Sequence, residues 1–246
     1  MMKTILITGA SSGIGEALAW KSLNQGHAVI ACGRSSEKLQ QFSTHPNATC
    51  LAFDMTDLSQ CRTSLSQVTC DIAVLNAGTC EYVDVEKFES DMFSRVMATN
   101  LFGATNILEI LLPQLQAGSK IVFVDSLARL LPFTRSQAYG ASKAAVHYLA
   151  KSLAVDLADR QITVQTQSPG FVKTPLTDKN DFSMPMQISA DQAAEYMLRG
   201  LLSAKTSIYF PRRFSMIIRL LSSLPESIQN YLCRKMRTAN ENSSDQ

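Results

Sequence analysis

Short apolar runs rich in Ile and Val alternate with longer amphipathic stretches along most of the chain. Most of the short runs are apolar throughout, as expected for strands that are covered on both faces. Strands that alternate with helical segments form a parallel sheet with helical crossovers. Strands are predicted at Thr4–Thr8, Ala28–Cys32, Thr49–Phe53, Ile72–Asn76, Lys120–Asp125 and Thr163–Ser168, with a weaker one near Ser207–Phe210.

Helical periodicity fills the intervals between these runs, and Gly, Ser or Asn often marks the turn from strand to helix. The pattern predicts an α/β fold, a doubly wound Rossmann-type parallel sheet of about seven strands with helices on both faces in three layers. Helices are expected near residues 14–25, 36–43, 57–66, 88–112, 137–158 and 190–203.

The 246 residues contain no Gly/Ser linker and no internal repeat, which indicates one domain. Residues 1–210 are expected to form its main part, and 211–237 an amphipathic helical extension split by Pro225. Residues 238–246 form a polar tail whose composition favours disorder. A segment from 171 to 189 contains Pro175 and Pro185 and is predicted as a long, functional loop.

The charge and cysteine content exclude several classes of protein. A net charge of +2 gives no argument for nucleic-acid binding. The six cysteines form no CxxC pair and no Cys/His cluster, so we expect no metal site and no disulfide framework. The apolar run at the N-terminus is too short for a signal peptide, and no run is long enough to span a membrane. A cytoplasmic protein is therefore predicted.

A glycine-rich turn, Thr8-Gly9-Ala10-Ser11-Ser12-Gly13-Ile14-Gly15, joins the first predicted strand to the first helix. Glycine allows a sharp turn and lets the backbone approach a phosphate without a Cβ in the way. The free N–H groups at the start of the helix then face the anion. The turn therefore predicts a dinucleotide phosphate site, the alternative being a turn with packing glycines.

The residue after the second strand bears on which dinucleotide binds. The sequence there is Cys32-Gly33-Arg34-Ser35, without the carboxylate that accepts a bond from a ribose 2′-hydroxyl. The guanidinium of Arg34 suits a 2′-phosphate, so NADP(H) is favoured over NAD(H). Arg34 could instead stack on the adenine or cap a surface.

A second set of residues has the spacing of a catalytic site. Tyr139 and Lys143 are four residues apart on a predicted helix, thirteen residues after Ser126. Asn76-Ala77-Gly78 ends the fourth strand, Asn100 lies in the long helix, and Pro169-Gly170 follows the sixth strand. With the glycine-rich turn, this order resembles the short-chain dehydrogenase/reductase family in its single-domain, NADP-preferring form over about residues 2–210, which implies a dinucleotide-binding and catalytic main domain.

The chemistry of the pair supports this resemblance. Residues four apart share a helix face, and a nearby ammonium is expected to lower the pKa of the Tyr139 phenol from about 10 toward neutrality. Tyr139 is then the general acid or base, and Ser126 hydrogen-bonds the same substrate oxygen. The resemblance implies that Lys143 also holds the nicotinamide ribose and that Asn100 positions a water. Taken singly, Tyr139 could be a core residue and Ser126 a helix cap.

The resemblance also assigns the rest of the cofactor site. Asp54 is expected to accept from the adenine amino group, and Val172 and Thr174 to meet the nicotinamide carboxamide and its phosphate. The complete expected set is Gly9, Ser11, Ser12, Gly13, Ile14, Gly15, Arg34, Asp54, Asn76, Ala77, Gly78, Tyr139, Lys143, Pro169, Val172 and Thr174. Asp125 and Arg129 depart from the family pattern, and Arg129 is expected to face solvent.

The substrate is expected to be a hydrophobic carbonyl or alcohol compound, because apolar residues cluster after Ser126 and in the 171–189 segment. The predicted wall residues are Leu127, Leu130, Leu131, Phe133, Phe171, Leu176, Phe182, Met184 and Met186. The extension 211–237 has three open interpretations: packing on the body or a neighbouring subunit, peripheral contact with anionic lipid, or a solvated tail.

These observations predict an oxidoreductase that transfers a hydride between NADP(H) and a carbonyl or alcohol, acting as a homodimer or homotetramer. One alternative is an NAD-dependent alcohol dehydrogenase. Others are a catalytically silent NADP(H)-binding regulator and a structural interaction protein that uses the basic C-terminus. The sequence contains Asn100, Ser126, Tyr139 and Lys143 together, which argues against a silent protein.

Overall fold

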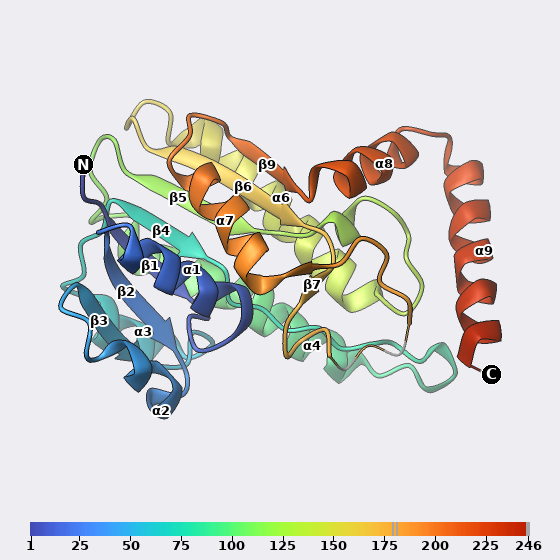
Figure 1. Ribbon diagram of the computed structural model, residues 1–246, viewed down its shortest axis with the longest axis horizontal. Coiled ribbons are helices and arrows are strands. Elements are labelled where there is room, and N and C mark those ends of the chain that lie inside the picture. Colours follow the sequence, from blue (N-terminus) through green and yellow to red (C-terminus); the bar gives the residue numbers. More distant parts are fainter. Residues whose placement is uncertain (179, 181, 245–246) are drawn as a thin grey trace.

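The computed structural model describes residues 1–178, 180 and 182–244, with side chains as far as residue 237. In this part of the chain, seven strands form one parallel sheet in the order β3-β2-β1-β4-β5-β6-β9 (Figure 1). The predicted fold class is confirmed, with strand ends within one or two residues of those expected. The strands are β1 (Thr4–Thr8), β2 (Ala28–Gly33), β3 (Ala48–Ala52), β4 (Ile72–Leu75), β5 (Lys120–Val124), β6 (Thr163–Pro169) and β9 (Ser207–Phe210).

Helices cover both faces of the sheet and bury its apolar strands. Ile5 and Ile7 of β1 point to one face, whereas Leu6 points to the other, and all three are fully buried. The first face is covered by α1 (Gly13–Asn24), α2 (Ser36–Leu39) and α7 (Ala190–Leu201). The second is covered by α3 (Leu58–Leu65), α5 (Gly103–Leu111) and α6 (Gln137–Asp156).

The helix predicted at 88–112 is divided into three parts. A short 3-10 turn (Val85–Lys87) leads to α4 (Ser90–Met97), and a π-helical turn (Ala98–Phe102) joins α4 to α5. A π-turn inserts an extra residue into the helix and often marks a functional site. Here it contains Asn100, whose side chain is buried.

The segment predicted as a loop at 171–189 is paired at its two ends. A short strand β7 (Val172–Lys173) lies parallel to β8 (Ile188–Ser189). The amide of Ile188 also donates to the carbonyl of Phe171 at 3.1 Å. This pairing holds both ends of the segment beside the carboxyl end of β6, which the strand-poor sequence did not predict.

Two helices follow the sheet, α8 (Arg212–Ser222) and α9 (Glu226–Ser244), separated at Pro225 as predicted. They form the end of the molecule opposite β3 (Figure 1). Phe214 and Ile218 of α8 are buried in a cluster with Leu127 and Leu131, so this helix packs on the body. Helix α9 continues beyond 238, where composition suggested a boundary. Among the described residues, no helix has the length and apolarity to cross a bilayer.

Candidate active site

The glycine-rich turn lies where the strand order reverses, between β1 and β4. In open parallel sheets, ligands bind at the carboxyl ends of strands beside such a reversal. The buried Thr8 ties the two strand ends together, because its Oγ1 accepts from the amides of Asn76 and Ala77, both at 3.0 Å. Asn76 Nδ2 in turn donates to the carbonyl of Thr8 at 3.0 Å. The sequence analysis placed Thr8 in the turn but missed this supporting role.

Close backbone packing explains the glycines of the turn. Gly9 has a φ of +69°, and a Cβ there would lie 2.9 Å from Cα of Ala77. A Cβ on Gly15 would lie 2.2 Å from the carbonyl oxygen of Gly9. Ser12 is the N-cap of α1 but its side chain makes no capping hydrogen bond in the described structure. The first turn of α1 therefore presents unpaired N–H groups to an anion, which fits a dinucleotide phosphate.

The loops after β2 and β3 form the adjacent corner. Arg34 follows β2 directly, is exposed, and has no ion-pair partner among the described residues. A Cβ on Gly33 would lie 3.2 Å from Oγ of Ser11, so the turn after β1 reaches this corner. Asp54 accepts from the amide and hydroxyl of Thr56 at 2.9 and 2.8 Å through one carboxylate oxygen. These positions leave Arg34 as a cation available to a phosphate.

Tyr139 and Lys143 lie side by side on α6, as the spacing predicts. The ammonium of Lys143 is 5.7 Å from the centre of the Tyr139 ring and donates to the carbonyl of Val124 at 2.9 Å. Lys143 is 4% exposed, and burial lowers its pKa to about 8, an effect that the nearby Asp125 carboxylate opposes. Lys143 therefore carries its charge at neutral pH and loses it in mildly alkaline solution.

The pKa of the Tyr139 phenol differs from the sequence-based expectation. Burial raises it above the ordinary value, and only a hydrogen bond with Ser126 acts in the opposite direction. The expected lowering of this pKa by Lys143 is not seen, because desolvation of the phenolate by burial is the largest effect. Ser126 follows β5, and its Oγ accepts from the amide of Ala128 at 3.1 Å. It is thus both the cap of a short turn and a partner of Tyr139.

Asn100 connects the loop after β4 to α6. Its Oδ1 accepts from the amide of Thr79 at 2.7 Å, while Nδ2 donates to the carbonyl of Thr79 and to Ser142 Oγ at 2.9 and 2.8 Å. A Cβ on Gly78 would lie 3.1 Å from Asn100 Oδ1 and 3.2 Å from Lys143 Nζ. The π-turn thus places Asn100 beside Gly78, on the same side of it as the ammonium of Lys143.

A buried charge cluster lies behind the pair. One oxygen of Asp125 accepts from Arg129 Nε at 2.8 Å and is 2.7 Å from Nδ1 of His147. The other oxygen has no hydrogen-bond partner among the described residues. The expectation that Arg129 faces solvent is wrong: its side chain is 9% exposed because the Asp125 carboxylate draws it inward. His147 is four residues after Lys143, so Tyr139, Lys143 and His147 follow one face of α6.

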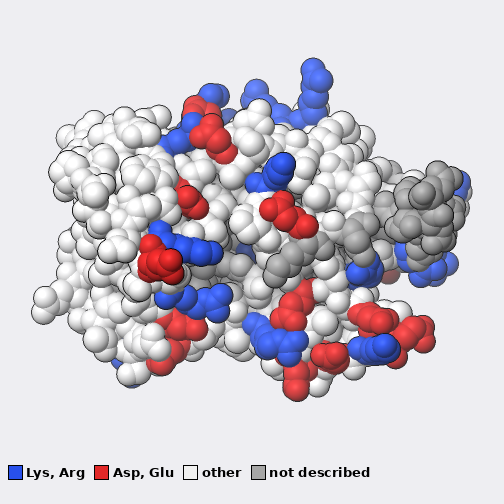
Figure 2. Space-filling view, turned by 60° about the horizontal axis from the view of Figure 1, so that its bottom comes forward, with Lys and Arg blue, Asp and Glu red and all other residues white. Residues whose placement is uncertain are grey.

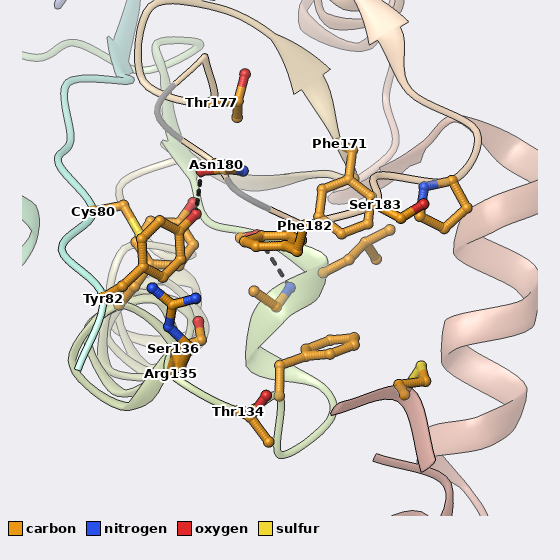
Figure 3. A pocket seen from close by; sticks show the side chains of 18 of the residues that line it. Cys80, Tyr82, Thr134, Arg135, Ser136, Phe171, Thr177, Asn180, Phe182 and Ser183 are labelled. Atoms are coloured by element: carbon orange, nitrogen blue, oxygen red, sulfur yellow. Dashed lines mark hydrogen bonds between the residues drawn. The ribbon is translucent and has the colours of Figure 1, made fainter. Parts of the chain in front are cut away.

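An apolar cavity of about 480 Å³ opens beside Tyr139 and Ser126. Figure 3 shows Cys80 and Tyr82 on one side and Phe171, Phe182 and Ser183 on the other. Burial raises the pKa of the Cys80 thiol to about 11, so it is a neutral wall residue at physiological pH. Of the predicted wall residues, Leu127, Phe133, Phe171, Leu176 and Phe182 line the cavity, whereas Leu130, Leu131, Met184 and Met186 are not among its lining residues.

Two segments meet over the cavity. The hydroxyl of Tyr82 is hydrogen-bonded to Asn180, and the rings of Tyr82 and Phe182 meet edge to face with centres 5.6 Å apart (Figure 3). The guanidinium of Arg135 lies 5.5 Å from the centre of the Tyr82 ring. Asn180 and Phe182 are therefore held against Tyr82 at the cavity wall.

The other predicted cofactor residues lie at or after the end of β6. Pro169 ends β6, and the carbonyl of Val172 accepts from Thr177 Oγ1 at 2.7 Å. Thr174 packs over the phosphate turn, since a Cβ on Gly13 would lie 3.2 Å from its side chain. The sequence analysis missed the cavity walls Cys80, Tyr82, Arg135, Phe214, Ile218, Cys233, Met236 and Arg237. Only the amphipathic pattern of 211–237 carried a signal for some of these residues.

Residues 3–183 match the family model of the short chain dehydrogenases. The chain belongs to the short-chain dehydrogenase family. An uncharacterized oxidoreductase of Myxococcus xanthus is 30% identical over 96% of this chain and 98% of that protein. A 3-oxoacyl-(acyl-carrier-protein) reductase of Rickettsia conorii is 36% identical over 72% of this chain and 76% of its own length. The sequence-based assignment to this oxidoreductase family is confirmed.

Solved structures of short-chain dehydrogenases share the fold. A 3-ketoacyl-(acyl-carrier-protein) reductase from Brucella melitensis, complexed with NADH, superposes with a TM-score of 0.75 and 25% identity over 85% of this chain and 96% of that one. A short chain dehydrogenase from Burkholderia cenocepacia, in complex with NADP, gives a TM-score of 0.84 at 22% identity over 94% and 97% of the two chains.

Proposed function

We propose that this short-chain dehydrogenase reduces a hydrophobic aldehyde or ketone with NADPH, and that Tyr139 supplies the proton. The observation that carries the proposal is the position of the protonated phenol of Tyr139, which lies beside Ser126 and Lys143 at one end of an apolar cavity. The glycine-rich turn packs on the loop after β4 through Gly9 and Ala77, and Gly78 of that loop lies against Lys143, so a cofactor on the turn would reach the pair.

The residues of the crevice fit a nicotinamide dinucleotide. Gly9, Ser11, Ser12, Gly13, Ile14 and Gly15 would surround the phosphates, and Arg34 a 2′-phosphate. Asp54 and Asn76–Gly78 would hold the adenosine, and Pro169, Val172 and Thr174 the carboxamide and its phosphate. Solved relatives carry NADH or NADP in their structures, so the preference for NADP(H) here rests on Arg34 and the lack of a carboxylate after β2.

The side chains divide the remaining chemistry between them. The cofactor, when bound, supplies a hydride to the carbonyl carbon. Tyr139 gives its phenolic proton to the carbonyl oxygen, and Ser126 donates a hydrogen bond to the same oxygen. The Lys143 ammonium then stabilises the phenolate and would hold the nicotinamide ribose. Asn100 keeps Lys143 and the loop after β4 in place, and it is proposed to position a water that links Lys143 to solvent.

Burial raises the pKa of Tyr139, so the phenol holds the proton that reduction of a carbonyl requires. The choice of NADPH over the NAD of an alcohol dehydrogenase rests instead on Arg34 and the lack of a carboxylate after β2. A silent cofactor-binding regulator would not need Ser126, Tyr139 and Lys143 brought together at a cavity.

We further propose a cytoplasmic homodimer or homotetramer that assembles through the long helices. Phe102, Tyr148 and Val155 are large apolar residues on the outer surface of the α4–α5 and α6 helices, and they are 56%, 78% and 76% exposed. Exposed apolar residues of this size favour a symmetric helix-to-helix contact between copies.

The test is an activity screen of aldehydes and ketones of increasing chain length with NADPH and with NADH. We expect the reduced cofactor to be consumed with NADPH and an apolar carbonyl, and the alcohol to be recovered as product. Titration of the protein with each cofactor alone measures binding separately. Tight NADPH binding with no turnover of any carbonyl would contradict the enzyme and favour the silent regulator.

A further inference from the structure

The C-terminal helices leave apolar side chains on their outer faces. On α8, Phe214, Ser215 and Ile218 are buried against the body, whereas Met216, Ile217 and Leu220 are 68%, 45% and 67% exposed. On α9, Cys233 is buried, whereas Ile228 and Tyr231 are 42% and 56% exposed. We call Met216, Ile217, Leu220, Ile228 and Tyr231 the C-terminal surface. Apolar side chains gathered in this way mark a contact site.

The two C-terminal helices are rich in basic residues. Residues 211–237 contain six basic residues (Lys or Arg) and one acidic residue (Asp or Glu). Residues 1–210, in contrast, contain 17 basic and 18 acidic residues. Arg212, Arg213 and Arg234 are exposed and have no ion-pair partner among the described residues. Figure 2 shows basic side chains at the end of the molecule where α9 lies. Helices that combine an exposed apolar face with basic residues lie in the interface of anionic membranes.

We propose that α8 and α9 dock this protein on an anionic lipid bilayer, with the C-terminal surface inserted among the lipids. A second copy of the chain fits this surface poorly, because a symmetric contact would bring the arginines of one copy against those of the other. Anionic headgroups neutralise the same arginines. The charge therefore selects the lipid surface over self-association at this site.

The same two helices line the candidate active site from within. Phe214 and Ile218 of α8 line the cavity, as do Cys233, Met236 and Arg237 of α9. The cavity thus extends from Tyr139 to the helices that would touch the bilayer. A substrate dissolved in the membrane can enter there without passing through water, with its carbonyl group directed to Tyr139.

This geometry names the substrate class, a step that rests on the proposed function. The substrate is a long-chain aldehyde or ketone partitioned into the bilayer. In the reaction, hydride from NADPH forms a C–H bond at the carbonyl carbon, and the proton of Tyr139 forms the O–H bond. The products are the long-chain alcohol and NADP+.

Vesicle binding tests the docking independently of activity. The full-length protein is sedimented with vesicles of phosphatidylcholine alone and of phosphatidylcholine with phosphatidylglycerol, at low and high salt. We expect binding to the anionic vesicles only, weakened by salt because the basic residues are screened. Equal binding to both vesicle types, or binding to neither, would overturn the proposal.

Two variants and a matched control separate charge, insertion and self-association. Loss of three cations in Arg212→Gln/Arg213→Gln/Arg234→Gln should lower the partition coefficient by about 100-fold. The variant Met216→Ser/Leu220→Ser should also lower the partition coefficient, because it removes inserted apolar side chains while it keeps the net charge of the protein. The control Lys87→Gln/Lys151→Gln/Lys205→Gln removes three exposed cations elsewhere and should bind as the natural protein does. If the serine variant changed only the oligomeric state, the surface would be a contact between copies.

Turnover then tests the substrate class. The arginine variant should reduce a water-soluble short-chain carbonyl as fast as the natural protein but lose activity on a long-chain aldehyde held in anionic vesicles. Equal activity of both proteins on the vesicle substrate would overturn entry from the bilayer. No turnover of any carbonyl by the natural protein would defeat the proposed function, while the vesicle result would still decide the docking.

Discussion

The two sides of the Tyr139–Lys143 pair are built in different ways. On the proposed cofactor side, backbone meets backbone: an added Cβ would lie 2.9 Å from Cα of Ala77 at Gly9 and 2.2 Å from the carbonyl oxygen of Gly9 at Gly15. On the substrate side, the walls are side chains such as Phe171, Phe182 and Phe214 from distant segments of the chain. A site made of backbone tolerates few substitutions, whereas a site made of side chains can be altered residue by residue.

The contrast predicts different responses to substitution. Backbone packed on backbone leaves no room for added side-chain atoms at Gly9 and Gly15. Side-chain walls set the size and polarity of the cavity. Substitutions at the pair, on each side of it, and behind it should therefore have distinct effects.

The largest effect is expected at the junction of the two sides. Tyr139→Phe removes the proton donor and should lower kcat by about 10²- to 10⁴-fold, with NADPH affinity unchanged. Steady-state kinetics and cofactor titration measure the two quantities. Tyr148→Phe, an exposed phenol on the same helix, is the control. Full activity of Tyr139→Phe would refute the mechanism.

The proposed cofactor side is tested at Arg34. Arg34→Ala should weaken NADPH binding by about 10- to 100-fold, since bonds to a charged group contribute roughly 1.5–3 kcal/mol, and leave NADH binding nearly unchanged. Lys38→Ala removes an exposed cation from α2 nearby and should change neither affinity. Equal losses for both cofactors would mean that Arg34 stacks on the adenine instead.

The substrate side is tested at an aromatic wall. Phe171→Ala removes contacts with Phe214 and Phe182, whose ring centres are 5.4 and 6.2 Å away. Loss of this apolar surface, about 1.5–3 kcal/mol, should raise KM for a long-chain carbonyl by about 10-fold or more with NADPH affinity unchanged. Phe88→Ala, at an exposed ring paired with Phe93, should leave KM unchanged. A changed cofactor affinity in Phe171→Ala would mean that the two sides are not independent.

The smallest effect is expected behind the pair. Burial lowers the pKa of Lys143 to about 8 and the Asp125 carboxylate opposes this, so activity should fall as pH rises through about 8. Asp125→Asn removes the carboxylate that raises the pKa of Lys143. The loss of activity at alkaline pH should therefore occur about one pH unit lower in this variant. The pH profile of kcat/KM measures it, with Asp159→Asn, an exposed carboxylate, as control. An unchanged limb would show that Asp125 only anchors Arg129 and His147.

The positions of the strands, the glycine-rich turn and the spacing of Tyr139 and Lys143 were predictable because they depend on local patterns. Apolar runs identify β1, β4 and β5, and the four-residue spacing of Tyr139 and Lys143 places both on one helix face. The π-turn at Asn100 was not predictable, because an uninterrupted helical pattern runs through it. The inward position of Arg129 was also missed, since solvent exposure depends on the Asp125 carboxylate reaching it in space.

The order of residues was enough to establish the fold class, the family and the pairing of a phenol with an ammonium. Short-range hydrophobic periodicity and residue spacing contain that information. The raised pKa of Tyr139 comes instead from three-dimensional packing, because desolvation sums over atoms contributed by many segments. The cavity that reaches from β5 to α9 has the same origin: residues 80 and 237 meet around one space only after the chain has folded.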